Sequence, residues 1–524
     1  MLDVRDIFES DYIGKEVTLS GWVRNHRKQK EFGFIDFSDG TCFKHLQVVY
    51  DNSLSDFDSI TKIKNGSSIE VTGTIVKSEG SGQSIELKAI TIKVLGDCPD
   101  DYPMQPKQHT REFLREQAYL RPRTNLFQAV FRVRSVCAYA IHKYFQERGY
   151  VYFHAPLITA SDCEGAGQMF QVTTLDLNRV NGKPDYDKDF FGKQTSLTVS
   201  GQLEAETFAM AYKKTYTFGP TFRAENSNTK THASEFWMIE PEIAFCDLQG
   251  DMDIMEGMLK YVVKYVLDNC KDEMVFLDKF VEKGLIEKLN RLVDSRFTRI
   301  KHKDVITILK DAKVKWEFEP NYGEDIAKEH EKYITEYFNG PVFITDWPKD
   351  IKAFYMKLNP DGKTVAAVDL EVPGAGELMG GSQREEDYEK LSFNTAISQL
   401  MIFINAAYKE EGLPREYAEG FVKLISPVCP FVGEELWSML GHSETIAYEK
   451  WPTYDETKLE EDTIEIPVQV NGKLRGIVKV EKDASQEMIK ERITANEDIQ
   501  KFINGKEIVK EIYIPGRMYT IVVK

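Results

Sequence analysis

The segment from Tyr216 to Glu242 constrains the fold of this chain more than any other stretch. Two runs of strand-forming residues flank a polar loop, which predicts an antiparallel hairpin. Arg223 and Glu225 lie two residues apart, so on a strand their side chains project from one face. His232 and Phe236 return on the second strand. This set suits a nucleoside triphosphate, with arginine for phosphate oxygens and phenylalanine for stacking on a purine. A salt-bridged surface hairpin is the plain structural alternative.

The letters FRAE at 222–225 and EFW at 235–237 resemble motif 2 of class II aminoacyl-tRNA synthetases. The asparagine-specific branch fits best, through FRAENSNT and EFWMIEPE. The resemblance implies that Arg223 holds the α-phosphate and the acyl oxygen of ATP-derived intermediates, and that Phe236 stacks on adenine. It also implies that Glu225 and His232 contact the nucleotide.

Composition narrows the class of protein. A chain of 524 residues suffices for about two to four domains. No apolar run is long enough for a membrane span, and the first residues lack a signal-peptide pattern. Seven scattered cysteines without a CxxC pair point to a reducing cytoplasm and offer no zinc site. The formal charge of −17 argues against indiscriminate binding of nucleic acid, but one folded RNA remains possible through local basic patches.

Residues 16 to about 97 contain five short strand patterns separated by turns, which predicts a closed OB barrel within an N-terminal domain of residues 1–100. The resemblance implies that this barrel reads the anticodon of tRNA(Asn). Phe34 matches the family's stacking aromatic, and Gln47 and Glu86 match residues that read base edges. Stacking with polar readout is the usual physics of single-stranded RNA recognition. Phe34 could instead belong to the barrel core.

A proline- and charge-rich stretch at residues 101–125 is typical of a linker. Apolar residues at helical spacing predict a helix over 126–148, at the start of an expected catalytic domain of residues 126–390. Pro156 lies where motif 1 places its proline, so the resemblance implies a homodimer. A proline alone would more often mark an edge strand.

The expected amino-acid site also follows from the resemblance. The glycine-bearing loop at 161–167 is similar to the mobile loop that closes over the amino acid, with Glu164 holding the substrate ammonium. Gln202 matches the glutamine that contacts the bound amino acid. Aspartate-activating relatives carry a lysine three positions later, where this chain has Ala205. Without that cation a buried aspartate carboxylate would be unpaired, which is costly. Asparagine is therefore the expected substrate.

Asp369 and Glu377 look like paired metal-binding acids, and Arg384 follows Glu377 by seven residues, as in the family. Two acids can hold Mg²⁺ ions that bridge ATP phosphates, and Arg384 would contact the amino acid. Acids beside glycines are otherwise ordinary loop residues. The implied reaction joins the asparagine carboxylate to the α-phosphorus of ATP and then passes the acyl group to the tRNA 3′ end.

The class II resemblance runs from about residue 3 to residue 386. No GxGxGxxR-like sequence, which would be motif 3 with its γ-phosphate arginine, occurs in the chain. Loss of that strand should leave an unpaired sheet edge and an exposed core. From Phe393 the sequence resembles the C-terminal region of leucyl-tRNA synthetases, a class I family. This implies a helical anticodon-arm domain over 391–455 and a small α/β module over 456–524.

We therefore expect an α+β multidomain protein with an OB barrel, an incomplete class II antiparallel sheet, and a helical bundle with a small α/β module. The expected activity is ATP-dependent ligation of asparagine to tRNA(Asn). Three alternatives stay open: a non-catalytic tRNA-binding protein, a chimeric product of two synthetase genes, and an enzyme that forms an amide on free aspartate. The barrel and Ala205 argue against the third.

Overall fold

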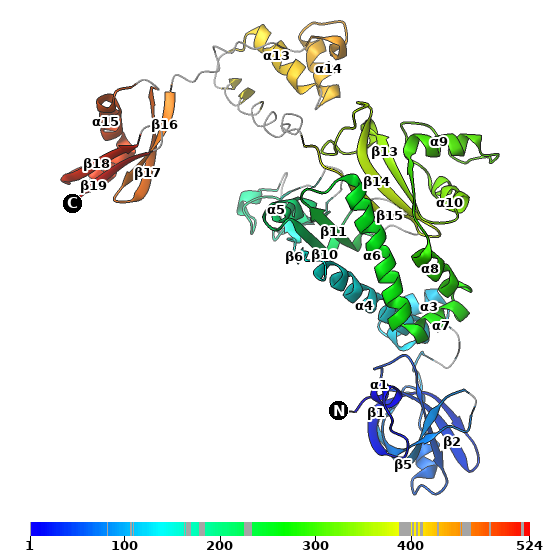
Figure 1. Cartoon of the computed structure of the whole chain (residues 1–524). Coiled ribbons are helices and arrows are strands. Elements are labelled where there is room, and N and C mark those ends of the chain that lie inside the picture. The colour runs from blue at the N-terminus through cyan, green and yellow to red at the C-terminus, as the bar shows by residue number, and fades with distance from the viewer. Residues whose placement is uncertain are drawn as a thin grey trace. The chain divides into compact units, whose positions relative to one another are not determined.

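The chain forms two compact units, Met1–Tyr388 and Glu389–Lys524, in a computed structural model (Figure 1). Each unit has hydrophobic cores of its own, and no core cluster of described residues contains members of both. The structure describes residues 2–80, 82–104, 107, 109–161, 163, 169–177, 184–224, 233–386, 400, 403–404, 407–408, 412–426, 429–450, 452, 463–481, 484–514 and 518–524.

The N-terminal part is a closed five-stranded barrel with strand order β1-β2-β3-β5-β4, so the predicted OB barrel is confirmed. Buried and outward-facing residues alternate along its strands, because successive side chains of a strand point to opposite faces. Ile35, Phe37 and Val48 are fully buried in its core. The elements are α1 (Val4–Glu9), β1 (Glu16–Lys28), β2 (Phe32–Ser38), β3 (Leu46–Asp51), α2 (Phe57–Ile60), β4 (Ser68–Lys77) and β5 (Ile85–Gly96).

The stretch expected to be a linker contains a short helix, α3 (Arg111–Glu116). Thr110 begins it as the N-cap, since its hydroxyl oxygen accepts a hydrogen bond from the Phe113 amide at 3.2 Å. The predicted helix over 126–148 is α4 (Asn125–Gln146), which Thr124 caps in the same way. Composition alone favoured a linker, because a helix as short as α3 does not change the high proline and charge content of the stretch.

The predicted hairpin is confirmed as β10 (Lys214–Phe222) and β11 (Glu235–Ile243), which pair antiparallel. A short strand, β6 (Val151–Tyr152), extends this sheet by pairing parallel with β10. Pro156 follows β6 outside any strand. Around this sheet lie α5 (Gln202–Tyr212), α6 (Leu248–Asn269), α7 (Lys271–Phe280), α8 (Leu285–Asp294), and the small sheet β7 (Ile158–Thr159), β9 (Thr195–Leu197) and β8 (Gln171–Val172).

A second sheet has the order β12-β13-β14-β15. Every residue of its strand β14 is buried, because helices cover both faces. Ala366, Val368 and Leu370 pack with α6, whereas Val365 and Ala367 pack with α9 and α10. The elements are β12 (Thr298–Lys301), α9 (His302–Asp311), α10 (Lys328–Tyr337), β13 (Val342–Pro348), β14 (Thr364–Val372) and β15 (Gly376–Ser382).

Among the described residues of the second unit, the helices α13 and α14 precede an α/β module with a four-stranded sheet. The expected helix starting at Phe393 lies mostly outside the described residues. The predicted hairpin is confirmed: Asn471 and Gly472, with φ of 51° and 76°, join β16 to β17. The elements are α13 (Arg415–Ile425), α14 (Pro430–Met439), β16 (Thr463–Val470), β17 (Lys473–Glu481), α15 (Gln486–Ala495), α16 (Glu497–Ile503), β18 (Ile508–Ile514) and β19 (Met518–Val523).

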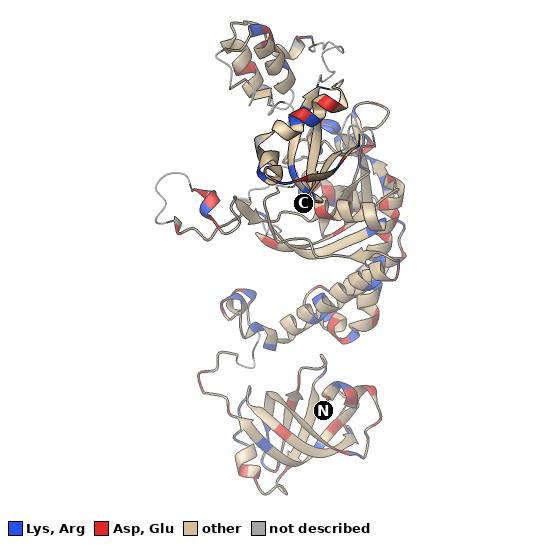
Figure 2. Ribbon diagram, turned by 90° about the vertical axis from the view of Figure 1, so that its left-hand side faces the viewer, with Lys and Arg blue, Asp and Glu red and all other residues tan. Residues whose placement is uncertain are grey.

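Acidic and basic residues are interspersed along the ribbon (Figure 2), so the net negative charge is not gathered in one segment. All seven cysteines are free thiols. Within the described ranges, no helix is both long and apolar enough to cross a membrane.

Candidate active site

One cleft of about 1650 Å³ brings together residues that lie far apart in the sequence. It lies between β11 and β15, and residues of α5 and α6 complete its walls. Its lining includes six of the predicted site residues, namely Gln202, Arg223, Phe236, Asp369, Glu377 and Arg384.

Arg223 and Phe236 face this cleft together. The guanidinium carbon of Arg223 lies 5.5 Å from the centre of the Phe236 ring. The strand β10 ends at Phe222, so Arg223 lies one residue beyond it, and Glu225, its expected partner on one strand face, lies outside the described residues. The Arg223 amide still donates to the Ser234 carbonyl oxygen at 3.1 Å, which holds the arginine beside β11. The side chain has two long hydrogen bonds among the described residues, both from Nη2, to the Val199 carbonyl oxygen at 3.4 Å and to Met238 Sδ at 3.9 Å, so the donors on Nη1 and Nε can serve a ligand.

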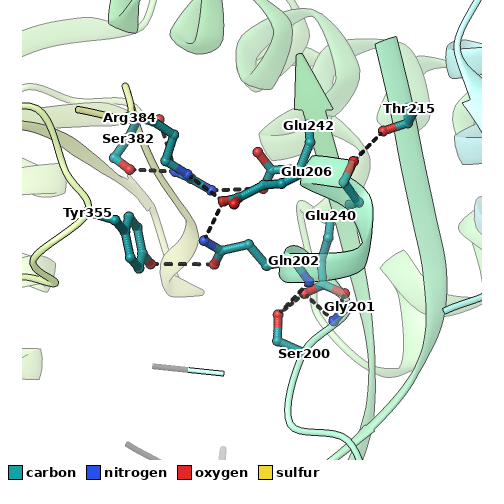
Figure 3. A network of polar contacts seen from close by, with 11 residues as sticks. Ser200, Gly201, Gln202, Glu206, Thr215, Glu240, Glu242, Tyr355, Ser382 and Arg384 are labelled. Atoms are coloured by element: carbon teal, nitrogen blue, oxygen red, sulfur yellow. Dashed lines mark hydrogen bonds and ion pairs between the residues drawn. The ribbon is translucent and has the colours of Figure 1, made fainter. Parts of the chain in front are cut away.

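Arg384 stands at the centre of a polar network that links β15 to β11 and α5 (Figure 3). Its Nη2 donates to Glu242 Oε1 at 2.8 Å, and its Nε donates to Glu206 Oε1 at 2.9 Å. Gln202 Nε2 also donates to Glu206 Oε1, at 3.0 Å, and the Tyr355 hydroxyl donates to Gln202 Oε1 at 3.4 Å. Gln202 and Arg384, predicted from separate motifs, therefore meet through one carboxylate.

Burial changes the proton affinity of the acids in this cleft. It raises the pKa of Glu242 to about 8 against the opposing effect of Arg384, and it raises that of Asp251 to about 6. Burial also raises the pKa of Glu240, whose carboxylate accepts hydrogen bonds from the Gly201 amide and the Ser200 hydroxyl. Arg384 opposes the rise at Glu242 because the two side chains form an ion pair at 2.8 Å.

Asp369 and Glu377 converge over Gly380. A Cβ built on Gly380 would lie 3.3 Å from Asp369 Oδ1 and 3.7 Å from Glu377 Oε1, so the glycine leaves room between the two carboxylates. Lys352 Nζ lies 2.7 Å from Asp369 Oδ2. Two oxygen donors around an open space fit a magnesium ion that keeps waters and binds phosphates. Among the described residues no group of three or more His, Cys, Asp or Glu side chains could hold a metal ion.

Sequence reasoning missed Glu206, Glu242 and Tyr355. Glu206 lies four residues after Gln202 on α5, so their shared helix face was a usable signal. Glu242 lies two residues after Glu240 on β11, on the same side of the strand. Tyr355 lies between the recognised motifs, in a stretch that carried no signal.

One other predicted feature of the amino-acid site, Ala205, lies away from the cleft. Ala205 is fully buried and does not line the cleft. The cation that does line the cleft on the amino-acid side is Arg384, and Glu206 and Glu242 compensate its charge. Glu164, Glu225 and His232 lie outside the described residues.

The structure also brings together the three predicted anticodon residues on the outer face of the barrel. Arg27 Nη2 donates to Gln47 Oε1 at 2.9 Å, and Gln47 Nε2 donates to Glu86 Oε2 at 3.3 Å. The Arg27 guanidinium carbon lies 5.3 Å from the centre of the Phe34 ring. Phe34 is half-buried on this face, while its neighbour Ile35 fills the core. The alternative that Phe34 is barrel core was wrong.

Comparison with known proteins identifies the family of the chain. A model of tRNA synthetases class II (D, K and N) matches residues 110–418, more than half of the chain. The asparagine–tRNA ligase of Acholeplasma laidlawii is 60% identical over 398 residues, which cover 74% of this chain and 86% of the relative. The chain belongs to the asparagine–tRNA ligase family. Its family is thus one of class II ligases, and the predicted fold class and enzyme class are confirmed.

Further comparisons agree with this assignment. The asparagine–tRNA ligase of Clostridium beijerinckii is 54% identical over 74% of this chain and 85% of its own length. The crystal structure of asparaginyl-tRNA synthetase from Pyrococcus horikoshii matches with a TM-score of 0.61 and 28% identity, over 74% of this chain and 84% of that one. The same enzyme complexed with asparaginyl-adenylate matches with a TM-score of 0.62 and 25% identity, over 84% of this chain and 97% of that one.

Two further family models match the ends of the chain. An OB-fold nucleic acid binding domain matches residues 17–95, and an anticodon-binding domain of tRNA ligase matches residues 382–491. The class II model continues to residue 418, so the prediction that the class II resemblance ends at residue 386 was too short. The chain thus combines a class II region with an OB-fold nucleic acid binding match and an anticodon-binding match.

Proposed function

We propose that this protein activates asparagine with ATP and transfers it to tRNA(Asn). The observation that carries the proposal is the shared cleft, in which Arg223 and Phe236 face Gln202 and Arg384. A guanidinium beside an aromatic ring suits a nucleotide, and an amide beside a paired arginine suits a small polar amino acid. One cleft then holds both reactants in reach of each other, which supplies much of the catalysis.

On the nucleotide side, Arg223 would bind the α-phosphate and Phe236 would stack on adenine. The N–H groups of Arg223 would stabilise the negative charge that develops on the α-phosphate oxygens when the asparagine carboxylate attacks. Glu225 and His232 would add contacts to the nucleotide. Asp369 and Glu377 would hold Mg²⁺, which supplies charge neutralisation of the triphosphate when bound.

On the amino-acid side, Gln202, Arg384 and Glu164 would bind asparagine. Arg384 is already paired with Glu206 and Glu242, so little positive charge remains for an aspartate carboxylate. A neutral amide needs only hydrogen bonds, and these carboxyls can accept from its NH₂ group. The pairing supports asparagine over aspartate.

The tRNA would be read at both ends of the chain. Phe34, Gln47 and Glu86 would contact the anticodon, and the region from residue 391 would add a leucyl-type helical arm and a small tRNA-contacting module. We propose the domain boundaries 1–100, 101–125, 126–390, 391–455 and 456–524, a homodimer formed through motif 1, and a cytoplasmic location. We also propose that the chain joins parts of two synthetases and lacks motif 3, with its γ-phosphate arginine.

The test is ATP–pyrophosphate exchange with the full chain. Exchange that depends on asparagine and is much weaker with aspartate supports the proposed activation step. Exchange that prefers aspartate would overturn the substrate. Saturable tRNA(Asn) binding without exchange for either amino acid would favour the non-catalytic tRNA-binding alternative, which the missing motif 3 sequence keeps open.

A further inference from the structure

A lysine contacts one of the two acids that the sequence predicts to bind a metal. Lys352 follows the short 3₁₀ helix η4 (Lys349–Ile351), and its Nζ lies 2.7 Å from Asp369 Oδ2. The Lys352 side chain is 17% exposed and the Asp369 side chain 10%. Asp369 lines the cleft, whereas Lys352 is not among the described residues that line it. The ion pair therefore lies behind the cleft wall, where water screens it little.

A buried indole holds the lysine in place. Lys352 Nζ lies 4.1 Å from the centre of the Trp347 ring. Trp347 is 1% exposed, and its Nε1 donates a hydrogen bond to the Ile344 carbonyl oxygen at 3.0 Å. Trp347 also belongs to the core cluster that contains Val342 and Val365. A cation over an aromatic ring that is packed so firmly has little freedom to leave its carboxylate.

The two oxygens of Asp369 have different surroundings. Oδ2 contacts Lys352, whereas Oδ1 lies 3.3 Å from the position of a Cβ built on Gly380. Glu377 Oε1 lies 3.7 Å from the same position. Because the lysine engages Oδ2, Oδ1 is the oxygen of Asp369 that remains beside Glu377 for a metal. The negative charge of that carboxylate is already shared with the lysine.

Lys352 is also the shared cation of a larger group of acids. Glu371 lies two residues after Asp369 on β14. Glu331 of α10 accepts a hydrogen bond from the Glu377 amide at 3.3 Å. Burial raises the pKa of the three acids on β14 and β15, and the charge of Lys352 opposes that rise in every case. A lysine in this position attracts the carboxylates and repels a second cation that approaches them.

We propose that Lys352 is a positioning residue that competes with Mg²⁺ for Asp369 and so weakens the binding of the metal in the absence of ATP. The proposal deepens the proposed function and rests on it, because it concerns the metal site of the activation step. It predicts a sign. Loss of the lysine charge should tighten metal binding, whereas loss of a merely structural contact should weaken it or leave it unchanged.

The experiment measures Mn²⁺ binding to the full chain, without nucleotide, by electron paramagnetic resonance. Mn²⁺ prefers the same oxygen ligands as Mg²⁺ and gives a signal that Mg²⁺ lacks. Lys352→Gln removes the charge and keeps a hydrogen-bond donor. We expect the dissociation constant of this variant for Mn²⁺ to fall at least about tenfold below that of the unmodified chain.

Three further variants locate the effect. Lys352→Arg keeps the charge and should bind Mn²⁺ within about threefold of the unmodified chain. Lys349→Gln, at an exposed position just before Lys352, should leave binding unchanged. Addition of Asp369→Asn to the Lys352→Gln chain should abolish the gain, because the carboxylate that would bind the metal is then absent.

Lys352→Met is a second neutral variant, whose apolar stem can remain on Trp347. It should show the same gain, and it decides the outcome if Lys352→Gln loses its main thermal transition in calorimetry. Unchanged or weaker Mn²⁺ binding by a folded neutral variant, or an equal gain in the Lys349 variant, would overturn the inference. Loss of folding in both neutral variants would also overturn it, since Lys352 would then be a structural anchor.

Asparagine-dependent ATP–pyrophosphate exchange separates this inference from the proposed function. Tighter Mn²⁺ binding by the neutral variants of a chain that shows no exchange would support the role of Lys352 and contradict the ligase activity. Exchange by the unmodified chain, together with unchanged Mn²⁺ binding in the neutral variants, would support the activity and overturn the role of Lys352.

Discussion

Arg223 is the residue on which the nucleotide half of the site depends. Its side chain has two long hydrogen bonds, at 3.4 Å and 3.9 Å, and a cation–π contact, and it takes part in no ion pair among the described residues. We expect Arg223→Ala to lower kcat/KM for ATP–pyrophosphate exchange by about 10²- to 10³-fold, as for loss of a donor to developing charge. The melting temperature should stay nearly unchanged, because so few contacts are lost.

Arg134→Ala is the matched control, since Arg134 is exposed on α4 and does not line the cleft. It should leave exchange at the level of the unmodified chain. Equal exchange by the Arg223 and Arg134 variants would contradict the role given to Arg223.

Glu371 makes the stability of the protein depend on pH. The side chain is 1% exposed, and its Oε2 has no hydrogen-bond partner among the residues that the structure describes. Burial, followed by the charges of Glu331 and Glu377, raises the pKa of Glu371 to about 9. Because an exposed glutamate titrates near 4.3, the folded state binds this proton more tightly, and stability is lost as the pH rises from about 4 to about 9.

Replacement of Glu371 by glutamine, which carries an uncharged amide, should remove this loss of stability at high pH. We expect Glu371→Gln to gain melting temperature relative to the unmodified chain between about pH 5 and about pH 8, by several degrees in calorimetry. The control is Glu112→Gln, at an exposed position on α3. Melting curves of the Glu371 variant that run parallel to those of the unmodified chain at every pH would show that Glu371 does not carry the dependence.

At the scale of elements, patterns local in sequence were predictable and long-range contacts were not. Hydrophobic periodicity and turn residues predicted the hairpin β10–β11, the barrel strands and α4, because both signals depend only on residues close together in the sequence. The contact of Arg384 with Glu242 joins residues 142 positions apart, and no local pattern specifies it. Glu371 occupies a strand position that only the packing of α10 reveals as buried.

The role of the barrel face around Phe34 in tRNA recognition can be tested separately from the activation of asparagine in the cleft. We expect Phe34→Ala to raise KM for tRNA(Asn) by about tenfold or more, because base–aromatic stacking contributes about 1–3 kcal/mol. ATP–pyrophosphate exchange should be unaffected, since Phe34 lies outside the cleft. Ile90→Ala, at a barrel position that is 47% exposed, is the control and should change neither quantity. A fall in exchange for the Phe34 variant would indicate a structural rather than a recognition role.

At the scale of the whole molecule, the two compact units predict separable functions. The cleft lies entirely within Met1–Tyr388, and the described core clusters belong to one unit or the other. A chain limited to residues 1–388 should therefore keep its main thermal transition and bind ATP and asparagine within about twofold of the full chain. Calorimetry and equilibrium dialysis measure these quantities.

Removal of the second unit should change the binding of tRNA instead. If the region from residue 389 contacts the tRNA backbone, its loss should weaken tRNA(Asn) binding and reduce the dependence of the binding constant on salt, because fewer phosphate contacts release fewer counterions. Titrations of both chains at several salt concentrations give the two slopes. Equal slopes and equal affinities would show that the second unit does not touch tRNA. A lost thermal transition in the shorter chain would show instead that Met1–Tyr388 needs the second unit to fold.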